Sequence, residues 1–184
     1  MIDVHSFDEG ILYPWGDDND QFSKPDMNFS NSKYDNVRGY PERDKTNYAD
    51  KPKEKLYKEY ILKTDLDWFK TTGKLISRAI SGVHGKKYTV KQSVGLYPTS
   101  ASSDDYSYSR HIIDTSKGKV MVYTLETGKE FQPPIKEGSS IIYEVSAGLM
   151  AFCLSLCKVT KNIESTETIL RDNSAKKSVM IRKK

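Results

Sequence analysis

Two short apolar runs, each followed by a chemically active side chain, constrain the fold of this sequence more than any other feature. Ile2–Val4 leads into His5 and Ser6, and Lys119–Leu125 leads into Glu126. Both runs have strand length, and the second is rich in β-branched and aromatic residues, as is typical of a central strand. In α/β folds, functional side chains concentrate in loops at strand ends. The sequence therefore predicts two buried strands with a candidate functional residue after each.

Amphipathic helices are predicted between and after these strands. Asp65–His84 carries apolar residues at helical spacing, with Thr64 or Asp65 as its N-cap and Gly85 as its stop. Its predicted buried face consists of Leu66, Phe69, Gly73, Ile76, Ile80 and Val83. Ser139–Cys157 predicts another helix. Its predicted buried face consists of Ile142, Val145, Leu149, Phe152, Cys153 and Leu156. Strands that alternate with amphipathic helices indicate the α/β class.

Three segments lack a clear helical or strand period. Asp17–Lys63 is rich in Asp, Asn, Ser, Lys, Tyr and Pro, and predicts a surface insertion. Leu96–Tyr108 is small, polar and aromatic, and predicts a binding loop that runs into a short helix near Asp104. Residues 159–184 are polar and basic, and predict a weakly structured tail. We therefore expect one domain over residues 1–158.

The charge distribution argues against a nucleic-acid surface. The net charge is +4, but much of it comes from the basic residues between positions 176 and 184. No apolar run approaches the ~20 residues that span a bilayer. Met1 leads into polar residues rather than into a signal peptide. The sequence therefore predicts neither a nucleic-acid partner nor a membrane partner.

The titratable residues allow more than one chemistry. The chain has three histidines and no HExxH or paired-cysteine motif, so the sequence by itself does not close a zinc site. A carboxylate that ends an apolar strand, such as Glu126, is partly desolvated, which raises its pKa and suits general-base catalysis. The alternative is that it caps or pairs at the strand end. Of the adjacent Asp104 and Asp105, one could bind a cation while the other ties the loop through side-chain hydrogen bonds. The alternative is that both are structural.

Four short motifs follow one another along the chain. Ile2–Phe7 (IDVHSF) precedes Leu12–Gly16 (LYPWG), Leu96–Tyr108 (LYPTSASSDDYSY) follows, and Val122–Glu126 (VYTLE) comes last. Together they resemble the third zinc-ligand segment, the substrate loop and the catalytic-glutamate strand of the M14 zinc carboxypeptidases, the carboxypeptidase A and B group. The resemblance covers roughly residues 1–157. It implies the C-terminal half of a mixed eight-stranded sheet flanked by helices.

The resemblance also implies roles for single residues. His5 matches the third zinc ligand, and Glu126 matches the general acid/base. Ser6 matches the adjacent residue that helps to hold the substrate backbone, and Tyr97 matches the mobile tyrosine that closes over the terminal residue. Asp104 occupies the position at the base of the specificity pocket, where an acid in carboxypeptidase B-like members favours C-terminal Lys or Arg. The implied cofactor is Zn²⁺, and the implied substrates are peptide or protein C-termini.

The sequence departs from the family pattern in informative ways. It lacks the upstream HxxE motif that supplies the other two zinc ligands, and the upstream Asn and Arg that clamp the substrate carboxylate. After Glu126 the chain continues TGKEFQPP instead of the familiar Leu-Arg-Asp. Together with the long insertion, this indicates a divergent, microbial-like branch. We therefore expect this chain to be the C-terminal half of a catalytic domain, and to be inactive without the N-terminal half.

Two functions remain open at this level. The leading one is a metallocarboxypeptidase that hydrolyses the C-terminal peptide bond by a zinc-water mechanism with a glutamate base. The alternative is a non-catalytic, truncated remnant that uses the pocket between Tyr97 and Asp104 as a peptide-binding or interaction module. The resemblance implies a secreted or extracellular protein, and the glycosylation sequon at Asn28 is compatible with that location.

Overall fold

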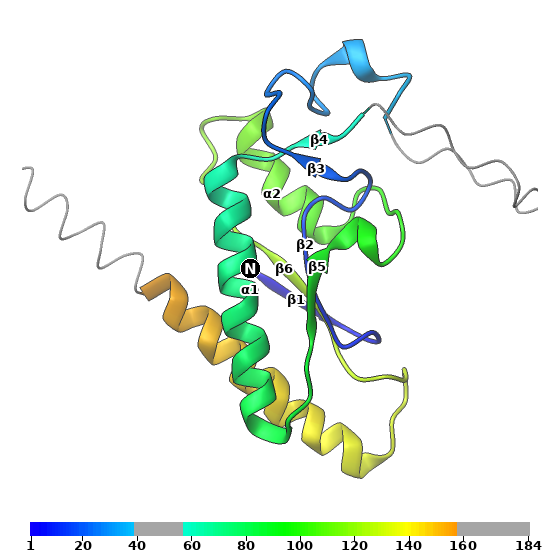
Figure 1. Ribbon diagram of the computed structural model, residues 1–184, viewed down its shortest axis with the longest axis vertical. Helices are drawn as coiled ribbons and strands as arrows, with labels where there is room; N and C mark the ends of the chain where they lie inside the picture. Colours follow the sequence, from blue (N-terminus) through cyan, green and yellow to red (C-terminus); the bar gives the residue numbers. More distant parts are fainter. Residues whose placement is uncertain (39–56, 158–184) are drawn as a thin grey trace, which may run out of the picture.

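The computed structural model describes residues 1–38 and 57–157, which build a mixed sheet with helices packed against it (Figure 1). In spatial order the four strands are β1 (Ile2–His5), β6 (Tyr123–Glu126), β2 (Gly10–Tyr13) and β5 (Thr89–Gln92). β1 pairs with β6 in parallel, β6 with β2 antiparallel, and β2 with β5 in parallel. A mixed sheet with helices confirms the α/β class, while the eight-stranded sheet stays a prediction.

β6 is the central strand of this arrangement. It has a neighbour on each side, and all four of its residues are buried. The prediction of an inner strand is therefore confirmed, but the strand covers Tyr123–Glu126 instead of Lys119–Leu125. β1 differs from the prediction of a buried core strand. Within the described residues it pairs only with β6, and its residue Val4 is 47% exposed.

The alternation of side chains divides the sheet into an apolar and a polar face. Tyr123, Leu125 and Ile11 belong to the hydrophobic core, together with residues of helix α1 (Lys63–His84). Since successive residues of a strand point to opposite faces, Thr124 and Glu126 turn away from this core. The register of β1 on β6 pairs Asp3 with Thr124 and His5 with Glu126, so Asp3 and His5 lie on the same polar face.

Helix α1 confirms most of the sequence prediction. Leu66, Phe69, Gly73, Ile76 and Ile80 are buried, and the helix ends at Gly85, whose φ of +78° is left-handed. Val83, which was predicted to be buried, is exposed.

The predicted side-chain N-cap of α1 is absent. The N-cap is Leu62, and it makes no side-chain capping bond. Asp65 instead accepts hydrogen bonds from Lys119 Nζ and from the Tyr108 hydroxyl at 2.7 Å. A carboxylate in the first helical turn therefore ties α1 to the approach to β6 and to α2 (Ser103–Ile113).

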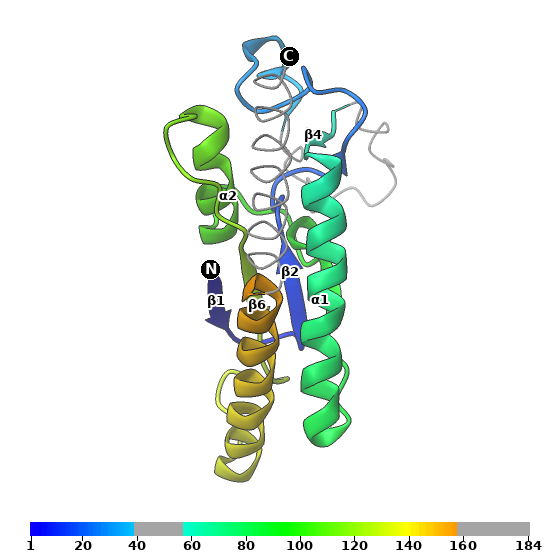
Figure 2. The same cartoon turned by 90° about the vertical axis from the view of Figure 1, so that its left-hand side faces the viewer.

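A further helix, Ile135–Cys157, packs beside α1 (Figure 2). Its Gly148 allows the close contact, because a Cβ there would lie 3.2 Å from side-chain atoms of Ile76 and Ile80. The side of the helix that packs against the protein holds Glu144, Gly148, Phe152 and Ser155. Much of the predicted buried face is instead exposed, namely Ile142, Leu149, Cys153 and Leu156.

A buried acid explains why the apolar pattern of this helix was misleading. Glu144 is fully buried, with its carboxylate 3.3 Å from His84 Nδ1 and bonded to the Tyr88 hydroxyl at 3.2 Å. These polar contacts turn a charged residue inwards and leave apolar residues outside. By length and composition the helix is also apolar enough to cross a membrane, so the prediction that no run has sufficient length is wrong.

The predicted insertion has structure at both of its described ends. β3 (Asp20–Gln21) pairs in parallel with β4 (Glu59–Tyr60), and a short 3-10 helix, η1, covers Ser32–Tyr34. Tyr57 and Ile61 are buried, so the end of the insertion enters the core. Residues 39–56 of the insertion and the predicted tail from 159 to 184 lie outside the described residues.

The contact between α1 and β5 predicts opposite effects for two glycines of one helix. Gly73→Ala would place a Cβ 2.6 Å from Val90 Cγ1, and we expect it to lower the free energy of unfolding by ~1–3 kcal/mol. Gly82→Ala meets nothing within 4 Å, and we expect it to raise that free energy by up to ~1 kcal/mol through helix propensity. Urea denaturation of both variants at low protein concentration measures the difference. Equal effects would contradict the close packing of α1 on the sheet.

Candidate functional site

The ends of β1 and β6 bring the two principal candidate residues together. The register of the parallel pair places His5 opposite Glu126. Beyond the strands, the backbone N–H and the hydroxyl of Thr127 both donate to the His5 carbonyl, each at 2.8 Å. Residues paired in register point to the same face, so the imidazole and the carboxylate both extend from the polar face of the sheet.

One side of the His5 imidazole is held by a carboxylate. His5 Nε2 lies 3.0 Å from Asp3 Oδ2, and the Ser103 hydroxyl donates to the same oxygen. The hydrogen bond with Asp3 raises the pKa of His5. The pKa of Asp3 is lowered, first by the bond from Ser103 and then by the bond from His5. Because the His5 side chain is 51% exposed, its second ring nitrogen is within reach of a ligand.

Glu126 is desolvated although it lies at the end of a strand. It is only 9% exposed, and burial raises its pKa, as expected from the sequence. The positive charge that His5 acquires on protonation opposes part of this rise. Asp8 adds to the rise and Lys91 opposes it, and these two form an ion pair of 2.7 Å. A carboxylate with a raised pKa is a better proton acceptor near neutral pH, which is the property that general-base catalysis needs.

Among the described residues, His5 could supply one protein ligand of a zinc site, but the further ligands of a complete site are not found beside it. Catalytic zinc takes three protein ligands, and residues 1–38 and 57–157 contain no group of three His, Cys, Asp or Glu side chains that could hold a metal ion. The other two histidines make contacts elsewhere. His84 Nδ1 lies beside Glu144, and His111 Nδ1 lies 2.6 Å from the Tyr108 carbonyl oxygen.

Two further predicted residues lie on loops. Ser6 directly follows His5 at the end of β1 and is half-buried. Tyr97 lies after η2 (Ser93–Gly95), in the predicted substrate loop, and is 60% exposed. An exposed side chain on a loop is free to move, but its closure over a substrate stays a prediction.

An aromatic pair beside the strand ends was not anticipated from the sequence. Phe7 packs edge-on against Phe131 with 4.8 Å between the ring centroids, yet the two residues are 45% and 72% exposed. Phe7 follows Ser6, and Phe131 lies in the loop that follows Glu126. Exposed rings at this place are suited to contact an apolar part of a ligand. The sequence signal that could have identified them is their closeness along the chain to His5 and Glu126.

Asp104, the predicted specificity residue, is held inside the beginning of α2. It is 1% exposed, and its Oδ2 accepts a short hydrogen bond from the Ser93 hydroxyl. Its Oδ1 accepts from the backbone N–H of Asp105 at 3.0 Å. Its charge makes only the smallest contribution to the raised pKa of His5, after the hydrogen bond and charge of Asp3 and the charge of Glu126.

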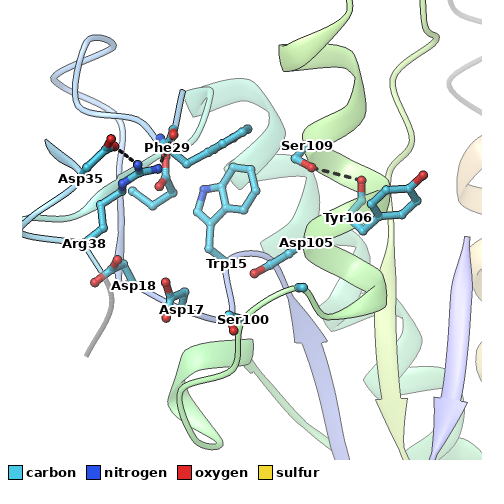
Figure 3. A pocket seen from close by; sticks show the side chains of 12 residues that line it. Trp15, Asp17, Asp18, Phe29, Asp35, Arg38, Ser100, Asp105, Tyr106 and Ser109 are labelled. Carbon is cyan, nitrogen blue, oxygen red and sulfur yellow. Dashed lines mark hydrogen bonds and ion pairs between the residues drawn. The ribbon is translucent and has the colours of Figure 1, made fainter. Parts of the chain in front are cut away.

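The neighbouring Asp105 lines a cavity of about 540 Å³ (Figure 3). Both of its carboxylate oxygens lie 3.0 Å from the backbone nitrogen of Gly16, which donates to them. Burial, followed by the charge of Asp104, raises the pKa of Asp105 to about 7. Burial also raises the pKa of Glu59, another lining residue, to about 7. The other charged lining residues are Asp17, Asp18, Asp35 and Arg38.

This acidic cavity lies at the other end of the sheet from His5. Gly10 pairs with Glu126, and β2 runs from there to Tyr13, just before the lining residue Trp15. The cavity is lined by Trp15 and by residues of the predicted insertion, the predicted substrate loop and α2, whereas the strand ends of β1 and β6 build the site. The cavity therefore does not form part of the His5–Glu126 arrangement.

Comparison with protein families decides the affiliation of the chain. The sequence profile of the zinc carboxypeptidases, Peptidase M14, matches residues 1–147. The chain belongs to the M14 zinc carboxypeptidase family. The resemblance predicted from the three motifs is therefore confirmed. A search among curated proteins gives no match.

Membership of the M14 family suggests a hydrolase with metallocarboxypeptidase activity, and implies peptide substrates and zinc. The matched residues include both strand ends and the predicted substrate loop, and the mixed sheet with its helices is compatible with the M14 fold.

Proposed function

We propose that this chain is the C-terminal half of an M14 metallocarboxypeptidase domain and supplies one zinc ligand, His5, and the general base, Glu126. One observation carries the proposal, namely the register that pairs these residues at the ends of two parallel strands. The proposal includes the secreted location expected of such an enzyme. The other zinc ligands would come from a segment that contains the HxxE motif.

The chain's own residues support this chemistry in distinct ways. Zinc, when bound, would polarise the scissile carbonyl and make a water molecule more acidic. Glu126 would hold the proton taken from that water and return it to the leaving amine, a task favoured by its raised pKa. Ser6 would contact the substrate backbone, and Phe7 with Phe131 would receive an apolar part of the peptide. Tyr97 would close over the terminal residue and exclude water.

The N-terminal half of the same domain is the partner that best fits the open side of this chain. β1 pairs on one edge only among the described residues, and an exposed strand edge favours pairing with another strand. The helix Ile135–Cys157 carries exposed apolar side chains, including Met150 and Leu154.

The open side predicts the behaviour of the isolated chain. We expect it to self-associate, because none of the residues in 1–38 and 57–157 covers the edge of β1 or the apolar helix surface, and to bind zinc only weakly. Combining Met150→Lys with Leu154→Lys should reduce self-association in sedimentation velocity. Ile113→Lys, a matched change of an exposed residue on α2, should not. A monodisperse monomer that unfolds cooperatively, or tight stoichiometric zinc binding in calorimetry, would contradict the proposed half-domain.

The catalytic assignment predicts a selective loss in the completed domain, prepared by co-expression with a segment that carries HxxE. Glu126→Gln should lower kcat by ~10²–10⁴-fold, because the side chain no longer accepts the proton. Zinc content should be unchanged, since Glu126 is not a ligand. Glu130→Gln, an exposed residue in the following loop, is the control and should retain activity. Near-normal turnover of Glu126→Gln would refute the assigned role. If no co-expressed segment restores zinc binding or hydrolysis, the non-catalytic alternative is favoured.

The proposed preference for C-terminal Lys or Arg rests on Asp104. Its carboxylate would pair with a cationic side chain of the substrate in place of its hydrogen bonds from Ser93 and from the backbone of Asp105. Asp104→Ala should lower the preference for Lys and Arg over Leu and Phe, in kcat/KM, by about 10–100-fold, as for the loss of a hydrogen bond to a charged group. Asp105→Asn is the control, because Asp105 lines the distant cavity. An unchanged preference in Asp104→Ala, or a loss only in Asp105→Asn, would reject the assignment.

A further inference from the structure

Asp3 holds His5 through a local arrangement that the motifs did not reveal. Residues two apart on a strand lie on the same face, so Asp3 and His5 of β1 are neighbours on the polar face of the sheet. Asp3 Oδ2 lies 3.0 Å from His5 Nε2. The same oxygen accepts the hydroxyl of Ser103, in the first turn of α2. The carboxylate is therefore anchored by a second element before it meets the imidazole.

The chemistry of this contact selects one form of the histidine ring. An ionised carboxylate only accepts hydrogen bonds. In neutral His5 the proton must then reside on Nε2, and Nδ1 keeps its lone pair. Among the described residues no hydrogen bond to Nδ1 is found, and the side chain is half exposed. The free ring nitrogen is thus the one available to bind a metal.

We propose that Asp3 is a positioning residue, which fixes the tautomer and the ring orientation of His5 so that Nδ1 is presented for metal binding. This inference rests on the proposed function, in which His5 is a zinc ligand. Carboxylates that accept from the second nitrogen of a ligating histidine orient the ring and increase its basicity. Ser103 extends the arrangement to α2, so the orientation of His5 is coupled to the helix that begins within the predicted substrate loop.

The ring nitrogens of His5 can be examined without zinc and without substrate. Long-range ¹H–¹⁵N NMR of the full chain, labelled at histidine, distinguishes protonated from unprotonated ring nitrogens. At about pH 9, well above the ordinary histidine pKa of ~6.5, we expect a single Nε2–H tautomer for His5. His111 is an internal reference, because its Nδ1 faces a carbonyl oxygen and must carry the proton. A predominant Nδ1–H tautomer in wild-type His5 would overturn the proposal, and this result needs no variant.

Three variants separate the role of Asp3 from a general effect of charge. Asp3→Ala should give His5 nitrogen shifts that are averaged between tautomers. Asp3→Asn keeps an acceptor oxygen, so its His5 nitrogen shifts should stay close to those of the wild type. Asp8→Asn removes a nearby carboxylate that makes its ion pair with Lys91, and should leave the His5 spectrum unchanged. Wild-type shifts in Asp3→Ala, or an equal change in Asp8→Asn, would contradict a specific role for Asp3.

Zinc binding by the completed domain provides a second readout. Competition with a chelator should show that Asp3→Ala weakens zinc binding by ~10–100-fold, as for other second-sphere partners of ligating histidines, while Asp8→Asn does not. Normal zinc affinity in Asp3→Ala would overturn the positioning role. If wild type binds no zinc but His5 has the expected tautomer, the proposed function fails while the effect of Asp3 on the ring stands. The two failures are therefore distinguishable.

Discussion

The parallel pairing of β6 with β1 is the interaction on which the rest of this structure depends. It alone places His5 opposite Glu126, although the two residues lie far apart in the sequence. Side chains alternate along a strand, so a slip of one residue would turn one of the two to the opposite face. The two hydrogen bonds from Thr127 to the His5 carbonyl fix the register at the C-terminal ends of both strands, where His5 and Glu126 lie. The backbone pairing of β1 with β6 therefore determines the relative positions of His5 and Glu126, on which their joint chemistry depends.

The two faces of the sheet make different contributions to that site. On the apolar face, Phe69 of α1 packs against Tyr13 and Tyr123, and burial of this kind immobilises β2 and β6. On the polar face, Glu126 is desolvated while His5 remains half exposed. One strand end therefore combines a carboxylate of raised pKa with an accessible imidazole. A rigid sheet can hold such a pair because the core that stabilises it lies on the other side.

The sequence predicts local features of this molecule well where a single element determines them. Gly85 stops α1, Leu125 is a core residue next to Glu126, and Asp104 begins a short helix. It predicts poorly where a distant polar contact decides the outcome. Glu144 faces inwards because its carboxylate contacts His84 and Tyr88. These contacts join distant parts of the sequence, so a hydrophobic period does not reveal them. The Asp3–His5 contact was missed although both residues lie in one motif, because it depends on the strand geometry and on Ser103.

The single proposed zinc ligand, His5, and the edge of β1 that is unpaired among the described residues are consistent with one partner rather than two. β1 is the strand that carries His5, and its edge is the place where a new strand would pair. A strand added there in parallel would end beside His5, from where its own side chains could share a metal with Nδ1. A membrane, or a second copy of the chain, would cover the apolar surface of Ile135–Cys157 but would bring no ligands to His5. Completion of the M14 domain by its N-terminal half accounts for both features at once, which is why we favour it over the non-catalytic alternative.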